Sequence, residues 1–438
     1  MSLAPYRRLL RRPAVRALVL VALVARIPNA SLGVIVTLHV VGPLGRGYGD
    51  AGLVAAAMTI GMAIGSPWRG RLVDRLGLRR ALLPSVLVEA VIWASAPLLG
   101  FGLLVGAAAL AGVFMVPIFS VVRQSLAVLV PEPEQRTAFA LDSVCTELTF
   151  MLAPALAVLV ATTWSTSVAL VYVGVATVGA GGLLMWFNPP TRSAQVSERA
   201  AAVLAARAAA GLVPNVPVAR VAGVLAPEVL APGLGGLSSD APRRGSRWLL
   251  SPGLLVVLLS SSAASLVLNG TDVSIVASLV EWGQASSAGW MIALWAGGSV
   301  IGGVLYGAGR RSVHPLTLVL ALALATLPAA FAGTPLLLAF AVVIAGVPCA
   351  PALSAITATL VRLVPEHRRG EVMGWNGSAM TVGAALGAPA CGALIDHAGP
   401  GAGFLAAGAI GAVVAAGGIV ALRVVRARRL AAGGPGGS

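Results

Sequence analysis

The feature that most constrains this chain is a series of twelve apolar segments, each long enough to cross a lipid bilayer. A helix needs about 20 apolar residues to cross a hydrocarbon layer of about 30 Å. Of the 438 residues, 58% are hydrophobic and only 10% are charged, which is more apolar than a soluble domain. The segments are continuous and do not alternate with period two, so they indicate helices and exclude the strands of a membrane barrel. We therefore expect an all-α membrane protein with twelve transmembrane helices, at residues 15–41, 50–68, 81–99, 102–129, 139–161, 165–187, 251–279, 286–308, 316–332, 335–362, 372–394 and 400–424.

Arginines mark every second loop between these segments. The net charge of +15 would suit nucleic acid only if it formed one basic face, and here it is divided among alternate loops, so no nucleic-acid partner is expected. By the positive-inside rule the arginine-rich loops are cytoplasmic, which places both termini in the cytoplasm and requires an even number of spans. This distribution predicts a multi-pass protein of the plasma (inner) membrane. The arginines concerned include Arg7, Arg8, Arg11, Arg12, Arg16, Arg69, Arg71, Arg75, Arg79, Arg80, Arg136, Arg243, Arg244, Arg247, Arg310, Arg311, Arg368 and Arg369.

The chain contains no lysine and only three cysteines. The absence of lysine excludes a Walker A loop and a Schiff-base lysine, so an ATP-driven pump of that kind is excluded. Cys145, Cys349 and Cys391 all fall within the apolar segments, where they predict small packing residues and not disulfides or metal ligands. We find no nucleophile–base or metal-ligand spacing, so neither a cofactor nor an enzymatic activity is expected.

The second half of the chain repeats the first at an offset of about 234 residues. The segment Ala111–Pro117 aligns with Ala345–Pro351, and the match continues without a gap through Glu132 and Glu366. Such a duplication predicts two six-helix bundles related by an axis along the membrane normal, with a substrate site between them near the midplane. We expect a monomer with an N-terminal bundle at 1–187, a cytoplasmic linker at 188–248 and a C-terminal bundle with a cytoplasmic tail at 249–438. Within the linker, residues 197–210 could form a short interfacial helix.

A dense polar turn, Gly70-Arg71-Leu72-Val73-Asp74-Arg75-Leu76-Gly77-Leu78-Arg79-Arg80, follows the second apolar segment. It resembles the loop 2–3 signature of the major facilitator superfamily of secondary transporters, G-x-x-x-D-R-x-G-x-R-R, at every fixed position. The resemblance implies that the acid and arginines of this turn latch the two bundles on the cytoplasmic side. The internal repeat, with small shifts, predicts a second, eroded copy at Gly302, Gly309 and Arg311, with Tyr306 in place of the acid. The residues that the resemblance assigns to this gating loop are Gly70, Asp74, Arg75, Gly77, Arg79 and Arg80.

Charged side chains within the apolar segments are the main candidates for function, because a charge at the centre of a membrane helix costs about 2.5–3.5 kcal/mol on insertion scales. Two of them belong to polar stripes on the first and seventh segments, which the resemblance places around the central cavity. Helix-to-helix hydrogen bonding would explain the polar residues of these stripes as well. The expected cavity residues are Arg26, Asn29, Gly33, Thr37, Ser265, Asn269 and Asp272, and the other buried charges are Glu89, Arg123, Asp142 and Glu147.

Arg123 and Glu147 lie at a similar depth on consecutive segments, Arg123 about two turns and Glu147 about two to three turns from the loop that joins them. An ion pair between them would lower the insertion cost of both. It could also couple to protons, since neutralising Glu147 would release Arg123, and a purely structural pair explains the pattern equally well. Asp142 lies closer to the cytoplasmic end, where we expect it to brace the gating loop.

The sequence thus predicts a secondary transporter that moves a small organic molecule across the plasma membrane by alternating access, with the lipid bilayer and protons as further partners. We expect efflux. Two alternatives stay open: a gradient-driven importer of a metabolite, with Arg26 anchoring an anionic substrate, and a non-transporting scaffold or receptor with the same fold. The span 4 and span 5 patterns of the superfamily's drug:proton antiporters are not intact here, since Thr149-Phe150-Met151-Leu152-Ala153-Pro154 lacks the expected glycines.

Overall fold

The structure, a computed structural model, describes residues 3–209, 251–284, 287–309 and 313–432. Residues 210–248 of the expected linker, Arg310, Arg311 and residues 433–438 of the tail lie outside the described residues. All regular secondary structure in the described part is helical. The N-terminal half contains α1 (Ala4–Leu10), α2 (Pro13–Val41), α3 (Tyr48–Leu76), α4 (Leu78–Ser95), η1 (Ala96–Leu98), α5 (Phe101–Phe114), α6 (Ile118–Leu129), α7 (Glu132–Thr163), α8 (Thr166–Phe187) and α9 (Ser193–Ala209). The C-terminal half contains α11 (Pro252–Glu281), α12 (Ala288–Ala308), α13 (Pro315–Thr326), η5 (Leu327–Phe331), α14 (Pro335–Gly346), α15 (Cys349–Leu363), η6 (Glu366–Arg368), α16 (Arg369–Ala398) and α17 (Pro400–Ala432).

Eleven helices of the described part are long and apolar enough to cross a membrane, and a shorter apolar helix at Pro315–Phe331 completes the twelve expected segments. Two of the spans are broken by proline. The fourth divides into α5 and α6 around Pro117, and the tenth divides into α14 and α15 at Pro348. Proline has no N–H and its ring clashes with the preceding turn, so each break occurs where the sequence removes a helical hydrogen bond.

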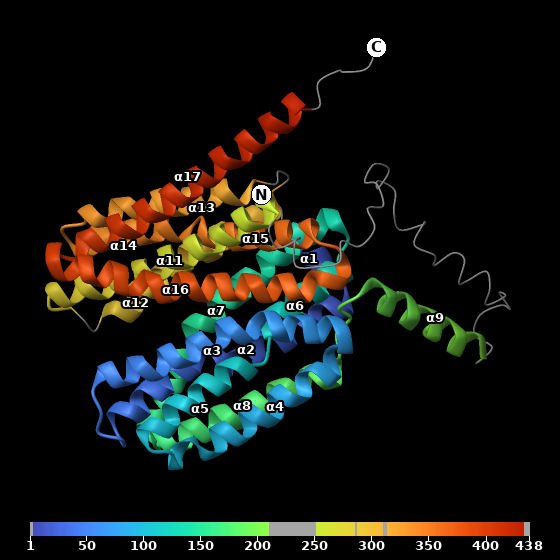
Figure 1. The fold of residues 1–438 in the computed structure, drawn as a ribbon, viewed down its shortest axis with the longest axis horizontal. Helices are drawn as coiled ribbons and strands as arrows, with labels where there is room; N and C mark the ends of the chain where they lie inside the picture. Colours follow the sequence, from blue (N-terminus) through green and yellow to red (C-terminus); the bar gives the residue numbers. More distant parts are fainter. Residues whose placement is uncertain (1–2, 210–250, 285–286, 310–312, 433–438) are drawn as a thin grey trace.

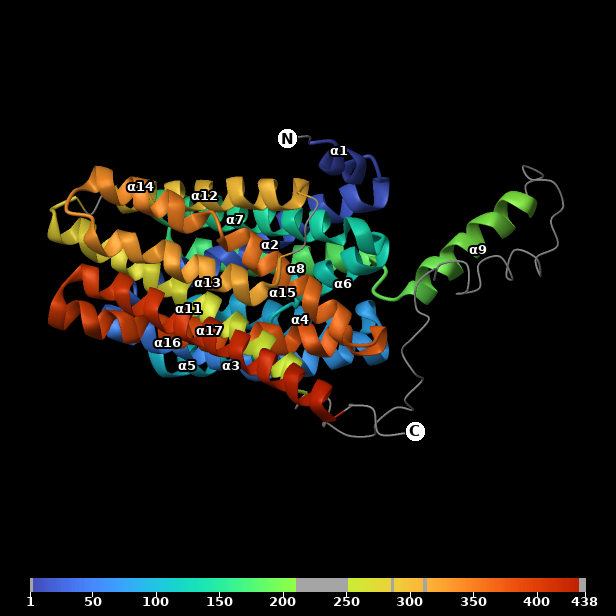
Figure 2. The ribbon, with the colours of Figure 1, turned by 90° about the horizontal axis from the view of Figure 1, so that it is seen from above.

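The helices form two bundles that lie side by side, α2–α8 in blue to green and α11–α17 in yellow to red (Figures 1 and 2). Their internal contacts repeat. A side chain at Gly65 would strike the backbone of Val113, and one at Gly302 would strike the backbone of Val347. Helix α3 therefore packs on α5 as α12 packs on α14, through the close approach that glycine permits.

This repeated contact corrects the expected second copy of the loop signature. Gly302 is the counterpart of Gly65, at an offset of 237 residues, and so is not the counterpart of Gly70. At the same offset Gly70 corresponds to Gly307, and Asp74 corresponds to Arg311. The sequence alignment was wrong at this point for two reasons. The stretch from Gly65 to Val113 is a few residues longer than the equivalent stretch from Gly302 to Val347, and glycines recur every few positions, so a shifted alignment still matches glycine to glycine.

The bundles meet through α3 against α16 and through α7 against α12 and α15. We call the end of the molecule that carries the α3–α4 turn at Gly77 and the η6 turn the arginine-rich end, and the end with loops 42–47 and 332–334 the opposite end. Helix α9 extends outward from the arginine-rich end (Figure 1). It occupies Ser193–Ala209, close to the short helix expected at 197–210, and the backbone N–H of Ser193 donates to Glu366 at the start of η6.

Candidate functional site

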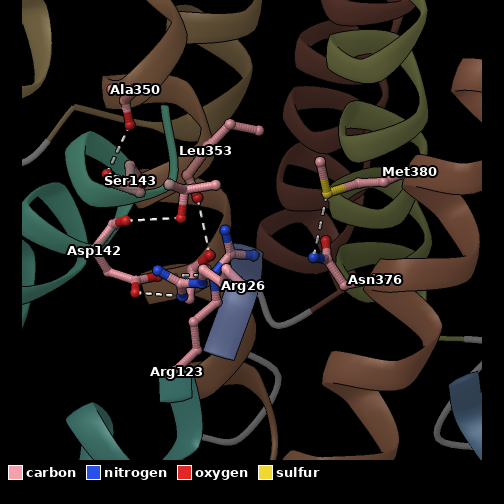
Figure 3. Close-up of polar contacts among 11 residues, drawn as sticks. Arg26, Arg123, Asp142, Ser143, Ala350, Leu353, Asn376 and Met380 are labelled. Atoms are coloured by element: carbon pink, nitrogen blue, oxygen red, sulfur yellow. Dashed lines mark hydrogen bonds and ion pairs between the residues drawn. The ribbon is translucent and has the colours of Figure 1, made fainter. Parts of the chain in front are cut away.

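Three charged side chains meet in the interior of the N-terminal bundle. Arg26 of α2 and Arg123 of α6 converge on Asp142 of α7 (Figure 3). The Arg26 Nη2 donates to one carboxylate oxygen at 2.6 Å, and the Arg123 Nε donates to the other at 3.4 Å. All three side chains are buried, with Arg26 at 0% exposure. Because a buried charge is tolerated only when it is paired, this cluster holds three helices in one arrangement.

The expected pairing of Arg123 with Glu147 is wrong, because Arg123 binds Asp142. The expectation that Asp142 braces the gating loop is wrong for the same reason. Asp142 and Glu147 are five residues apart, which places them about 140° apart around α7. The face with Asp142 turns toward α2 and α6 of its own bundle, and Glu147 turns toward the other bundle. Similar depth in the membrane could not distinguish these two faces.

The guanidinium of Arg26 has hydrogen-bond donors that the described part of the protein does not use. Its plane lies over the ring of Phe119, with Cζ 4.9 Å from the ring centroid. Its Nε and Nη1 are buried and have no hydrogen-bond acceptor among the described residues. Two guanidinium groups here share one carboxylate, so the cluster carries an excess positive charge next to unused donors.

Glu147 and Asp272 lie at the contact between the bundles. Glu147 of α7 accepts from the Sγ of Cys349 on α15, at 3.5 Å, and this contact joins the two bundles. Asp272 of α11 lies close enough to Glu147 for the two carboxyl groups to interact electrostatically. Neither has a cationic partner among the ion pairs of the described residues. The interface therefore holds two acids that the fold itself does not neutralise.

The polar stripes of α2 and α11 divide into two groups. Asn29, Gly33 and Thr37 of α2 are partly or fully exposed, and the Thr37 hydroxyl donates only to the carbonyl of Gly33 in its own helix. Asn269 of α11 likewise donates to the carbonyl of Ser265, one turn earlier. Within the described part of the chain, the side chains of Asn29, Thr37 and Asn269 make no hydrogen bond to another helix, which leaves them available to a ligand.

Two serines of α11 bind a neighbouring helix. The Ser261 hydroxyl donates to Asn376 of α16 at 2.7 Å, and Ser262 donates to the carbonyl of Ala379 at 2.7 Å. These bonds fit the alternative explanation, in which polar side chains join membrane helices.

Glu89 accepts a hydrogen bond from the backbone of its own bundle. Its Oε1 accepts from the N–H of Val116 at 2.8 Å, in the break between α5 and α6. That N–H lies at the helix break before Pro117, and the buried carboxyl group, 2% exposed, satisfies it. The geometry thus gives Glu89 a structural partner within its own bundle and separates it from the acids at the interface.

The gating loop joins the two bundles at the arginine-rich end. The Asp74 carboxylate accepts from the backbone N–H groups of Gly370 at 3.0 Å and Glu371 at 2.8 Å, in the first turn of α16. These are the unpaired donors of a helix N-terminus, where the helix dipole favours a negative charge. Gly70 permits the approach, since a Cβ there would collide with the carbonyl of Gly370.

The arginines of the loop have more varied roles than the resemblance implies. The counter-charge across the interface comes from Arg71, whose Nε donates to Glu371 at 2.7 Å. Arg79 donates to the carbonyl of Met185 near the end of α8 and so stays within its own bundle. Arg75 and Arg80 are exposed. Arg71 and Glu371 are 300 residues apart, and the repeat alone did not predict their contact.

Gly77 makes the turn between α3 and α4. Its φ of +77° lies in the left-handed region, which favours glycine. After this turn, Arg79 and Arg80 lie in the first turn of α4.

Comparison with known proteins identifies the family. The family model described as Major Facilitator Superfamily matches residues 18–308 and 257–437. A search of curated proteins gave no match.

Among solved structures, the human organic anion transporter MFSD10 (TETRAN) is 16% identical over 92% of this chain and 99% of its own, with a TM-score of 0.65. The proton:xylose symporter XylE bound to 6-bromo-6-deoxy-D-glucose is 14% identical over 92% and 94%, with a TM-score of 0.66. A bacterial homologue of the iron transporter ferroportin, in an outward-facing state, is 18% identical over 93% and 99%, with a TM-score of 0.64. At these identities the likeness concerns the fold alone. With eleven spanning helices and one shorter apolar helix in its described part, arranged in two repeated bundles, this chain is a multi-pass membrane protein and belongs to the Major Facilitator Superfamily.

Proposed function

We propose that this protein is a secondary transporter of the plasma membrane that exports a small organic molecule by alternating access. The observation that carries the proposal is the bridge between Asp74 and the first turn of α16. This bridge joins the bundles at the arginine-rich end, and it consists of hydrogen bonds that a rocking motion can break and remake. Contacts between Arg71 and Glu371 and between Ser143 and Ser354 belong to the same half of the interface. A monomer without a cofactor suffices for this mechanism.

The positive-inside rule supports an orientation in which the arginine-rich end and both termini face the cytoplasm. In that orientation the contacts at this end close the cytoplasmic side, and the conformation is outward-facing. Transport would then require the Asp74 and Arg71 bonds to open while the opposite ends of the bundles approach each other.

Protons are the coupling ion that the charges of the interface favour. Glu147 and Asp272 lie between the bundles without a cationic partner, and an acid in that position can carry a proton at lower cost than a charge. In the outward-facing state these carboxyl groups would load protons from outside as the substrate leaves. Inward return of the protons would then drive export.

The second candidate is import of an anionic metabolite. It is favoured by the excess positive charge of the Arg26–Arg123–Asp142 cluster and by the unused donors of Arg26. In the present conformation Arg26 is fully buried, so an anion would reach it only after the helices around it move. A scaffold or receptor with this fold is the remaining alternative.

The experiment combines a ligand screen with a flux measurement. Thermal-shift screening of the purified protein against charged and neutral organic compounds identifies binders, and proteoliposomes with an imposed pH gradient then measure their movement. We expect a binder whose flux runs against the proton gradient and loses its pH dependence in Glu147→Gln. Glu281→Gln, the same change at an exposed position of α11, is the control.

Each other outcome selects an alternative. Flux in the same direction as protons, with an anionic binder, would support import. Binding without flux in either gradient would support a receptor and contradict the proposed transport.

A further inference from the structure

The short helix α1, which precedes the first membrane span, contacts both bundles. Helix α1 packs on α2 and α7 of its own half and on α12 of the other half. Tyr6 is 8% exposed and Leu9 is 0% exposed, so one face of this helix is buried although it lies before the first span. A segment that continues into the N-terminal bundle is thus inserted against the C-terminal bundle.

The Tyr6 hydroxyl connects α1 to helix α12 of the C-terminal bundle. It donates to the carbonyl of Gly303 at 2.9 Å, and the carbonyl of Val304 lies at 3.2 Å, so one proton is shared between two acceptors. Both carbonyls belong to the last turns of α12, near the arginine-rich end. Burial raises the pKa of Tyr6 to about 12, so the docked hydroxyl keeps its proton to a higher pH than an exposed tyrosine does.

Two arginines hold α1 against α7. Arg12 lies 2.9 Å from the Glu134 carboxylate, and Arg8 lies 3.7 Å from it, at the start of α7. Arg8 belongs to α1 and Arg12 to the turn that follows it, so both pairs connect this segment to the start of α7, although exposed pairs of this kind contribute little stability. Tyr6 is therefore positioned from the N-terminal bundle and binds the C-terminal one.

The surface of α12 is shaped for this contact. A Cβ at Gly307 would collide with the Tyr6 hydroxyl and approach the Cβ of Ala140 on α7 at 2.9 Å. The carbonyl of Gly307 also accepts from the Thr137 hydroxyl at 2.7 Å. Gly307 is the counterpart of Gly70, so the close-approach glycine of the α3–α16 contact has an equivalent here, and Tyr6 occupies the space beside it.

We propose that α1 is a second latch of the arginine-rich end and that the Tyr6 hydroxyl is the group that binds α12. Helix α1 must then leave α12 whenever the bundles separate at this end. The inference rests on the proposed alternating access and assigns a conformational role to a segment that precedes the duplicated unit. The latch stabilises the state closed at the arginine-rich end, and weakening it shifts the protein toward the state open at that end.

The test measures the distance between the bundles in the full-length protein. Spin labels replace Leu76 at the end of α3 and Leu363 at the end of α15, which are both exposed, and the three buried cysteines are replaced by alanine. Tyr6→Phe keeps the ring and removes the donor, and Tyr172→Phe makes the same change at an exposed position of α8. We expect Tyr6→Phe to raise the ratio of open to closed protein about threefold to tenfold, and Tyr172→Phe to leave it unchanged.

A third variant, Asp74→Asn, separates the two proposals. If Asp74→Asn opens the arginine-rich end and Tyr6→Phe does not differ from Tyr172→Phe, α1 is not a latch and the alternating-access proposal stands. If neither variant changes the distances, neither contact acts as a latch and the inference about α1 fails, while the alternating-access proposal is judged by the flux measurement. A lower melting temperature of Tyr6→Phe without a change in distances would show that Tyr6 only stabilises the fold, and would also overturn the inference.

Discussion

Replacing Asp74 with asparagine should release the closed arginine-rich end. In the native protein one carboxylate accepts two backbone N–H groups at the start of α16, at 3.0 and 2.8 Å. Asparagine has nearly the same shape but only one acceptor atom. Its oxygen can accept from one N–H, while its NH₂ group faces the other N–H and repels it.

The size of the effect follows from these two bonds. A hydrogen bond to a charged group contributes about 1.5–3 kcal/mol, and one such bond is lost. The interaction of the negative charge with the helix dipole, about 0.3–1 kcal/mol, is lost with it. The closed state should therefore lose about 2–4 kcal/mol relative to the open state. Since each 1.4 kcal/mol is a factor of ten, the ratio of open to closed protein should rise about thirtyfold to several hundredfold.

Cys349 is a native reporter of this opening. It is fully buried beside Glu147 at the contact between α7 and α15, and separation of the bundles would expose its thiol. With Cys145 and Cys391 replaced by alanine, the labelling rate by an impermeant maleimide is measured in vesicles that expose the arginine-rich end. We expect the labelling rate of Cys349 to be much higher in Asp74→Asn than in the native protein, up to the rate at which the open state predominates.

The control is Asp50→Asn, the same change in the first turn of α3. Asp50 makes only a loose, solvent-exposed ion pair with Arg46 at 3.9 Å, so its loss should leave the labelling rate near that of the native protein. Equal rates in Asp74→Asn and Asp50→Asn would refute the latch. A rise in Asp74→Asn together with loss of the folded protein would show a structural role instead, so thermal unfolding is measured on the same samples.

Three further predictions concern other residues. Glu89→Gln keeps an oxygen for the Val116 N–H and should leave flux and its pH dependence unchanged, whereas Glu89→Leu should lower the free energy of unfolding by about 1–3 kcal/mol, as measured by denaturation in detergent. Arg26→Met leaves Asp142 with only its longer bond and should cost about 3–5 kcal/mol, and adding Asp142→Asn should recover part of that loss in a double-mutant cycle. Raised pH should release α1 from α12. Tyr6 loses its proton near the ordinary pKa of 10.0 when α1 is undocked and near 12 when it is docked. Docking is therefore at full strength below pH 10 and is lost as the pH rises toward 12. Ultraviolet absorbance counts the tyrosinates formed, and the rise near pH 12 should be smaller by one tyrosine in Tyr6→Phe than in the native protein.

The number of helices and their division into two bundles could be predicted because both depend on regular features of the chain. Apolar length decides where a helix crosses the membrane, and the repeat at 234 residues shows which helices are equivalent. The register of individual contacts was harder. Gly302 was assigned to Gly70 by its spacing to nearby residues, and only the packing against Val347 shows that it corresponds to Gly65.

The charged residues show where sequence reasoning stops. Burial of a charge in a membrane predicts that it has a partner, but depth alone does not say which one. Arg123 had two acids within reach on the next helix, and the choice of Asp142 depends on the rotation of α7 and on Arg26 arriving from α2. Tyr6 gave no signal at all, because one tyrosine among arginines before the first span resembles an ordinary membrane anchor.

The two inter-bundle contacts are related by the duplication, and their differences support a latch at each. At α3–α16, Gly70 lets two backbones approach and Asp74 binds the amides of α16. At α12–α7 the glycine is retained as Gly307, but the position of the acid corresponds to Arg311.

A duplicated protein that lost the acid on one side would close unevenly unless other bonds replaced it. Thr137, at the position equivalent to Glu371, and Tyr6 from outside the repeat both donate to carbonyls of α12. One latch therefore depends on a charge at a helix N-terminus and the other on neutral hydroxyl donors. The two sides of the gate can for this reason respond differently to salt and pH, although they descend from one repeated unit.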